Sequence, residues 1–209
     1  MTIHYPNGQS PVPGQAAAKA TPGPTSFADR GMTLEAEINA SNDYYLATGQ
    51  AVIHKKPTPI QLVKVDYPKR SAAVVREAYF RRPSTTDYNG IYRGYYIDFD
   101  AKETRNKASF PLKNFHQHQI DHLAACLKQG GICFAFIKFT RLDKHFLLPA
   151  SDLIAHWQAQ ATGGKHSIPL AVIEQTGVPV AYGYHPRLKY LPAVDQLIAR
   201  QKGAASNEQ

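Results

Sequence analysis

The stretch Ser84-Thr-Thr-Asp-Tyr-Asn-Gly90, followed by Tyr96-Ile-Asp-Phe-Asp-Ala-Lys102, decides the expected fold. Successive side chains of a strand point to opposite faces, so the alternate residues of each stretch share a face. In the second stretch the core face is Ile97, Phe99 and Ala101, and the polar face is Asp98, Asp100 and Lys102. In the first stretch, Thr85 and Asp87 share a face. The pattern predicts two adjacent strands that gather carboxylates and a lysine.

The Asp100-Ala101-Lys102 triplet is a weak signal when taken alone. About one acid-x-lysine triplet is expected by chance in a chain of this composition, and this is the only one present. A salt-bridged edge strand explains the spacing about as well. The upstream acid Asp87, and a downstream helix that supplies a further polar group, favour a metal-binding site over a simple salt bridge. Carboxylates with a lysine beside them can hold a divalent metal next to a phosphate, which is nuclease chemistry.

Length and composition bound the class of protein. The 209 residues suit one domain with a sizeable core. No apolar run approaches the roughly 20 residues that span a bilayer, and no basic segment followed by an apolar one opens the chain. We therefore expect a cytoplasmic protein. Cys126 and Cys133 lie seven residues apart and form no metal-ligand pattern, so we expect reduced core thiols.

The net charge of +8 and the sequence pI of about 9.4 favour a polyanionic partner. Much of this charge lies in one window, residues 55–82, which carries eight basic residues against two acidic ones. Nucleic acid is the first partner to consider and an anionic membrane the second. The window contains no long amphipathic helix, so a membrane partner is not expected.

Hydrophobic periodicity, prolines and glycines divide the chain into expected elements. Residues 1–29 are rich in Pro, Gly, Ala and Ser and predict a disordered arm, followed by one domain over residues 30–202 and a disordered tail over 203–209. Prolines around the extended segment 60–67 place it at an edge or in a protrusion. Helices are expected over 31–46, 114–129, 151–160 with Ser151 as N-cap, and 194–201; strands over 51–54, 73–80, 85–92, 95–104, 132–139 and 145–148. This order predicts an α/β domain with a mixed sheet.

Long blocks of the chain carry a more specific signal. The blocks are Arg30–Glu35, Ile53–Pro59, Tyr67–Ala72, Ser84–Gly90, Ile97–Thr104, Phe110–Phe115, Gln119 and Gly131–Phe134. Over residues 30–200 the sequence resembles the RecU family of Holliday junction resolvases, within the PD-(D/E)xK nuclease superfamily. The resemblance implies a restriction-endonuclease-like sheet flanked by helices, with a protruding stalk. It also implies a structure-selective endonuclease that resolves Holliday junctions by paired symmetric cleavage in recombination and DNA repair.

The resemblance also implies the residues of the site. The metal ligands are expected at Thr85, Asp87, Asp100 and Gln119, and Lys102 is expected to stabilise the transition state. Asp87 and Asp100, as hard oxygen donors, suit Mg²⁺, which Mn²⁺ can replace. The family commonly has glutamate where this chain has Asp100. We expect function to survive the change, with a slightly altered metal geometry.

Other polar residues carry less weight. Glu35 lies on the first expected helix, where related nucleases use an acid near the metal. Asp98 shares a face with Asp100 and is expected either to support the ligands or to pair with an arginine. His116, His118 and His122 suggest a zinc site, but no further Cys/His cluster in the sequence completes one. Solvated helix histidines are the favoured interpretation.

Symmetric cleavage of a four-way junction implies a homodimer with one site per subunit. The resemblance assigns residues of about 56–75 to a stalk that enters the junction, and no membrane is involved. Further partners to consider are the strand-exchange recombinase and a branch-migration helicase. The phosphate-contacting residues are expected to be Lys56, Lys64, Lys69, Arg70 and Arg76, which predicts strongly salt-dependent binding.

Two alternatives remain open on sequence alone. The first is a junction-binding architectural protein that modulates the strand-exchange recombinase without efficient cleavage, for which the unusual Asp100 leaves room. The second is a restriction-type nuclease that acts on linear duplex. The stalk block argues against the second, because such an enzyme has no use for a protrusion at the centre of a junction.

Overall fold

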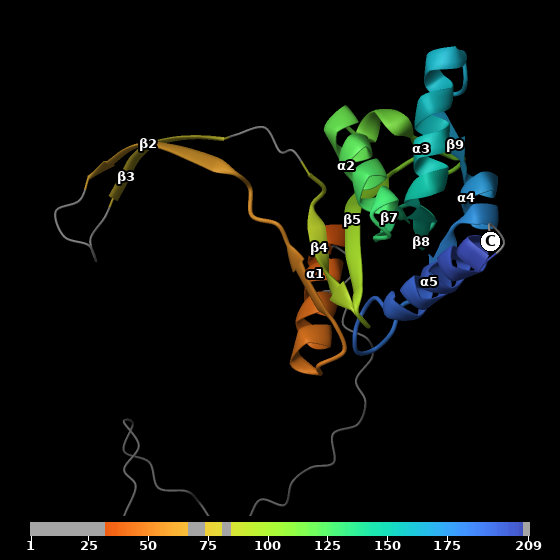
Figure 1. The fold of residues 1–209 in the computed structure, drawn as a ribbon, viewed down its shortest axis with the longest axis horizontal. Coiled ribbons are helices and arrows are strands. Elements are labelled where there is room, and N and C mark those ends of the chain that lie inside the picture. Colours follow the sequence, from red (N-terminus) through yellow and green to blue (C-terminus); the bar gives the residue numbers. More distant parts are fainter. Residues whose placement is uncertain (1–31, 67–73, 81–84, 207–209) are drawn as a thin grey trace, which may run out of the picture. The chain divides into compact units, whose positions relative to one another are not determined.

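The computed structural model describes residues 32–66, 74–80 and 85–206 (Figure 1). The expected arm of residues 1–29 lies outside these ranges, as do Lys69 and Arg70 among the predicted DNA contacts.

A six-stranded mixed sheet forms the centre of the domain, in the strand order β1-β4-β5-β7-β8-β10. β5 and β7 are parallel neighbours, and the other pairs in this sheet are antiparallel. Its strands are β1 (Val52–Lys55), β4 (Tyr88–Tyr92), β5 (Tyr95–Thr104), β7 (Ile132–Phe139), β8 (Lys144–Pro149) and β10 (Val178–Val180). A small antiparallel pair, β6 (Ser109–Pro111) with β9 (Ser167–Pro169), forms a separate sheet. The predicted α/β class with a mixed central sheet is confirmed.

The helices begin and end where local chemistry favours it. Thr33 caps the first helix, since its hydroxyl accepts the Ala36 N–H at 3.3 Å, and acids in the first turn suit the helix dipole. Gly130, with φ +84°, follows the second helix, as the Gly130-Gly131 stop predicted. The helices are α1 (Leu34–Ala47), α2 (Gln117–Lys128), α3 (Ala150–Ala159), α4 (Leu170–Thr176) and α5 (Leu191–Ser206), with 3₁₀ turns at Leu112–Asn114 and Gln160–Thr162.

Two hydrophobic clusters cover the two faces of the sheet. On one face, α1 and α5 pack against the odd-numbered residues of β5. Phe99 lies at the centre of that cluster, stacked on Tyr88 and Phe134 with centroid distances of 4.8 and 4.7 Å. The other face carries α2, α3 and α4. The predicted core face of β5 is thereby confirmed, and its polar face must lie on the α2 side.

Three local predictions differ from the structure. β4 begins at Tyr88, so Thr85 and Asp87 lie in the segment before the strand rather than in it. Pro149, not Ser151, is the N-cap residue of α3, and it makes no side-chain cap. α5 extends from Leu191 to Ser206, beyond the predicted 194–201 helix and into the expected tail, because its apolar face packs along the sheet.

A second antiparallel sheet, which we call the β2–β3 ribbon, consists of β2 (Ile60–Asp66) and β3 (Val74–Phe80). The predicted extended segment 60–67 and strand 73–80 thus pair with each other and join no strand of the central sheet. Its large apolar side chains are exposed, among them Leu62 and Tyr79. The register shifts on either side of Lys64.

Within the described ranges, none of the helices combines the length and apolar character needed to cross a lipid bilayer.

Candidate active site

Strand β5 positions the acidic residues. Asp98 and Asp100 are fully buried, and Lys102 is partly buried two residues further along the same face. In the parallel register with β7, Asp100 lies opposite Ala135, whose methyl group leaves room beside the carboxylate. Alternation along β5 therefore holds a line of charged side chains beneath α2, inside an otherwise apolar layer.

Asp87, Asp100 and Lys102 form one cluster, which we call the acid–lysine centre. The Lys102 ammonium lies 2.6 Å from Asp100 Oδ1 and 3.6 Å from Asp87 Oδ2. Asp87 immediately precedes β4, and its carbonyl accepts the Lys56 N–H at 2.7 Å, which fixes its backbone. The Asp87 side chain is 42% exposed while that of Asp100 is 0% exposed. The centre is therefore open to solvent at Asp87 and closed behind Asp100.

The pKa of the Asp100 carboxyl is shifted by its surroundings in the acid–lysine centre. Burial raises the pKa of its carboxyl to about 7, the adjacent Asp87 carboxyl adds to the rise, and the Lys102 ammonium opposes it. Its Oδ2 atom is buried and has no hydrogen-bond partner among the described residues. A buried carboxylate oxygen without a partner is costly. A divalent cation would satisfy it, so the donor set fits the metal that the sequence predicted.

The other predicted metal ligands are less directly placed. Thr85 borders, with Asp87, a hollow of about 280 Å³; its hydroxyl donates to the Thr86 carbonyl at 3.2 Å. Gln119 is buried in the first turn of α2, and its Oε1 accepts the His116 N–H at 3.0 Å. That oxygen is thus already hydrogen-bonded to a backbone N–H just before the helix. Ligation of a metal ion by Gln119 stays a prediction.

Glu35 lies at the rim of the same hollow. It pairs with Lys55 at 2.5 Å, and both side chains are more than a third exposed. The hollow brings Glu35, Lys55 and Lys56 to the side on which Thr85 and Asp87 lie. The structure therefore places Glu35 near the predicted metal ligands, but engaged with a lysine.

Asp98 has a different environment from Asp100. Its carboxylate accepts hydrogen bonds from the Thr86 hydroxyl, from Lys56 Nζ at 3.0 Å and from Tyr96 Oη at 2.8 Å, and it contacts His122 Nε2 at 3.1 Å. Its cationic partner is a lysine rather than the expected arginine. Because Thr86 stands between Thr85 and Asp87, Asp98 anchors the segment that carries both of them.

The predicted DNA contacts divide between two environments. Lys56 is turned inward to Asp98 and Thr86 instead of outward to solvent. Lys64 is exposed on β2, and Arg76 on β3 pairs with Asp66 at 2.6 Å. The Lys56–Asp98 pair could not be predicted from local sequence patterns, since the two residues are 42 positions apart. His122, expected to be solvated, contacts Asp98.

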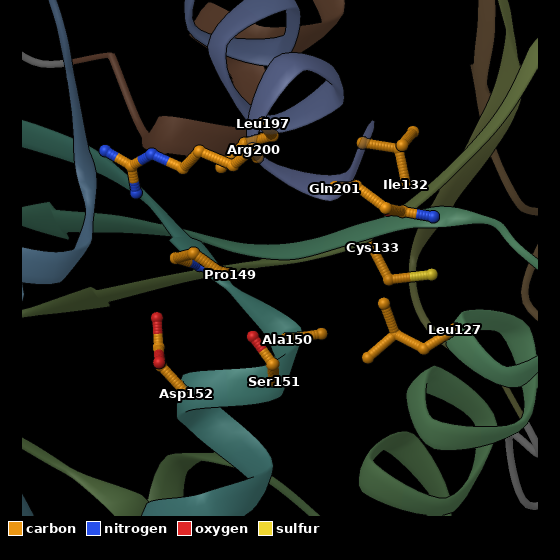
Figure 2. A pocket seen from close by; sticks show the side chains of 10 residues that line it. All are labelled: Leu127, Ile132, Cys133, Pro149, Ala150, Ser151, Asp152, Leu197, Arg200 and Gln201. Carbon is orange, nitrogen blue, oxygen red and sulfur yellow. The ribbon is translucent and has the colours of Figure 1, made fainter. Parts of the chain in front are cut away.

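A larger hollow of about 440 Å³ lies elsewhere, and its lining is mostly apolar (Figure 2). Residues of the ends of α2 and α5 and of the start of α3 border it, and none of the predicted site residues does. The smaller, polar hollow is the better candidate for the active site, because carboxylates and lysines line it.

A mixed sheet flanked by helices, with buried aspartates and a lysine on one of its central strands, defines a nuclease of the restriction-endonuclease-like class. The RecU family, described as Recombination protein U, matches residues 29–196. The chain belongs to this family.

Close relatives cover nearly the whole chain. The Holliday junction resolvase RecU of Limosilactobacillus fermentum is 67% identical over 209 residues, which cover 98% of this chain and 99% of that protein. The protein of the same name from Limosilactobacillus reuteri is 67% identical over 201 residues, with 95% and 98% covered. That from Lactiplantibacillus plantarum is 60% identical over 200 residues, with 95% and 97% covered.

Proposed function

We propose that this chain is a structure-selective endonuclease that resolves Holliday junctions by paired, symmetric, metal-dependent cleavage in recombination and DNA repair. The observation that carries the proposal is the acid–lysine centre, with a buried Asp100 oxygen that has no hydrogen-bond partner in the part of the chain that the structure describes. The relatives named above are called Holliday junction resolvases, and this chain matches them over nearly their full lengths. This similarity supports the choice of substrate.

Asp87 and Asp100 would hold the divalent cation, with Thr85 and Gln119 as the further ligands proposed from the resemblance. Mg²⁺ is the expected ion and Mn²⁺ its substitute, because the donors are hard oxygens. When bound, the cation supplies Lewis-acid polarisation of the scissile phosphate and lowers the pKa of coordinated water. Sulfur is absent from this donor set, which suits such ions.

Lys102 has a separate role. Its ammonium lies between the two carboxylates that would hold the cation, so it would stand beside a phosphate bound at that cation. A preorganised cation in a partly buried site stabilises negative charge on a phosphate more effectively than one in water. Asp98 acts through others, by fixing Thr86 and Lys56 against β5.

The β2–β3 ribbon is the proposed junction-binding element, within the stalk expected at about residues 56–75. Its exposed apolar side chains and exposed Lys64 give a surface that can meet both bases and phosphates. Lys69 and Arg70 add to the proposal from sequence. A homodimer would bring two acid–lysine centres to two phosphates related by the two-fold axis of the junction.

A comparison of substrates tests the proposal. The protein is incubated with a labelled mobile four-way junction and with the matching linear duplex, in Mg²⁺ and in chelator. We expect paired symmetric nicks in the junction alone, and only with the metal. Cleavage of the duplex at an equal rate would favour a restriction-type nuclease. Tight junction binding without cleavage, in Mg²⁺ and then in Mn²⁺, would favour an architectural protein instead.

A further inference from the structure

A second cluster beneath α2 contains sulfur and nitrogen as well as oxygen. His122 Nε2 lies 3.1 Å from Asp98 Oδ2 and 3.6 Å from Cys126 Sγ. The three potential ligand atoms all lie within 4.8 Å of one another. His122 and Cys126 are one turn apart on α2, so they share the helix face that covers Asp98 on β5.

A second cysteine lies close to these three residues. Cys133 on β7 is the register partner of Asp98 on β5, so both side chains leave neighbouring strands on the face that α2 covers. Its thiol is not among the three ligand atoms that lie within 4.8 Å of one another. Helix α2 and strand β5 thus bring a carboxylate, an imidazole and a thiol together, although the two cysteines show no metal-binding spacing in the sequence.

We propose that Asp98, His122 and Cys126 bind a Zn²⁺ ion, at a site separate from the acid–lysine centre. With Zn–S near 2.3 Å and Zn–N and Zn–O near 2.0–2.2 Å, a tetrahedral ion separates S from N by about 3.6 Å and N from O by about 3.4 Å. The distances across His122, 3.6 and 3.1 Å, are close to these. Thiolate and imidazole donors select zinc over the hard Mg²⁺ of the neighbouring centre.

The charges in the cluster also fit. One thiolate and one carboxylate carry two negative charges, which the two positive charges of Zn²⁺ balance. Hydrogen bonds from Lys56 and Tyr96 to the carboxylate are the supporting contacts that metal-ligating carboxylates usually have.

The ion would have a structural role. It would tie α2, which carries Gln119, to β5, which carries Asp100 and Lys102. Asp98 and Asp100 are two residues apart on one strand face, so the two sites would lie roughly 7 Å apart along β5. Binding to the folded state alone would raise the melting temperature. The proposal does not depend on nuclease activity.

Cobalt substitution tests the site directly. The full chain is reduced with a phosphine reductant, saturated with Mg²⁺ to fill the acid–lysine centre, and titrated with Co²⁺. We expect near-ultraviolet thiolate-to-cobalt charge-transfer absorption and intense visible bands of four-coordinate Co²⁺ that saturate at one equivalent and disappear when Zn²⁺ is added. The acid–lysine centre cannot give the charge-transfer band, because it contains no sulfur.

Variants show whether the band comes from these residues. Cys126→Ser and His122→Ala should lose it. Asp100→Asn should keep it, as should His156→Ala, a control that removes a histidine one turn from the carboxylate of Asp152 on α3. Circular dichroism confirms that each variant is folded. No thiolate band in the wild-type chain, or a band that survives in both Cys126→Ser and His122→Ala, would overturn the proposal.

Discussion

The acid–lysine centre and the β2–β3 ribbon are built in opposite ways. Asp100 is 0% exposed on a strand paired on both sides within the six-stranded sheet. Among the described strands, β2 and β3 of the ribbon pair only with each other, and their apolar side chains are exposed, with Ile60 54% and Tyr79 60% exposed. A two-stranded sheet of this kind has little stability of its own.

The difference indicates which part of the molecule suits catalysis and which suits nucleic-acid recognition. Charge stabilisation needs donors held in fixed positions by a packed surrounding, which the sheet supplies. Recognition of a branched nucleic acid needs exposed side chains that can meet a partner, which a ribbon supplies without disturbing the core. We therefore expect changes in the centre to alter cleavage and changes in the ribbon to alter binding.

Removal of the Lys102 ammonium should give the largest effect. Lys102→Met keeps the aliphatic stem but loses the charge between Asp87 and Asp100. The single-turnover rate of junction cleavage should fall by about 10²–10³-fold. Junction affinity should change little. Lys144→Met is the matched control, since that lysine on β8 is half exposed and pairs with Glu174 on α4. An equal loss of rate in the control would contradict the role of Lys102.

The pH dependence of cleavage should come from the centre. The pKa of Asp100 is raised to about 7 by burial and by Asp87, so below that pH the carboxyl is largely protonated and cannot hold a cation. At subsaturating Mg²⁺, the cleavage rate should fall about tenfold for each pH unit below about 7. More Mg²⁺ should move the midpoint to lower pH, because metal and protons compete. A rate that is flat between about pH 6 and about pH 8, one unit on either side of that pKa, would contradict this.

The same pKa shift predicts how stability changes. A carboxyl whose folded pKa lies above its unfolded value costs stability as the pH rises from about 4 to about 7. In chelator, the melting temperature of the wild-type chain should therefore decline over this range relative to Asp100→Asn, and Mg²⁺ should reverse the decline. A difference between the two proteins that is independent of pH would show that Asp100 does not titrate in this way.

Charge reversal on the ribbon should give a smaller and different effect. Lys64→Glu should weaken junction binding by about tenfold, or about 1.4 kcal/mol, with a smaller loss on linear duplex. The slope of log affinity against log salt should fall by about one. Thermal stability should be unchanged because Lys64 is exposed. Lys144→Glu serves as the control, and equal weakening on junction and duplex would refute the ribbon as the junction-binding element.

The strands of the centre could be predicted from sequence because their information is local. Period-two alternation gave the limits and the faces of β5, and the continuous apolar run gave β7. The segment before β4 could not be read in this way. Its conformation depends on the Thr86–Asp98 bond and on the Lys56–Asp87 backbone bond, which join parts of the chain far apart in sequence.

The candidate site was predictable only in part for the same reason. Asp87, Asp100 and Lys102 come together as alternation and strand pairing require. The inward turn of Lys56 and the contact of His122 with Asp98 depend on how distant segments of the chain pack on β5. Such packing has no local signature in the sequence, so the sequence did not show that His122 and Cys126 lie beside Asp98.

The most direct test of the central claim is Asp100→Asn, measured for junction cleavage and junction binding in the same preparation. The substitution keeps the shape of the side chain and removes the carboxylate whose Oδ2 has no hydrogen-bond partner within the described ranges. The account predicts that cleavage in Mg²⁺ is abolished while the Kd for the four-way junction is unchanged. Substantial remaining cleavage, or a loss of binding as large as the loss of cleavage, would contradict it.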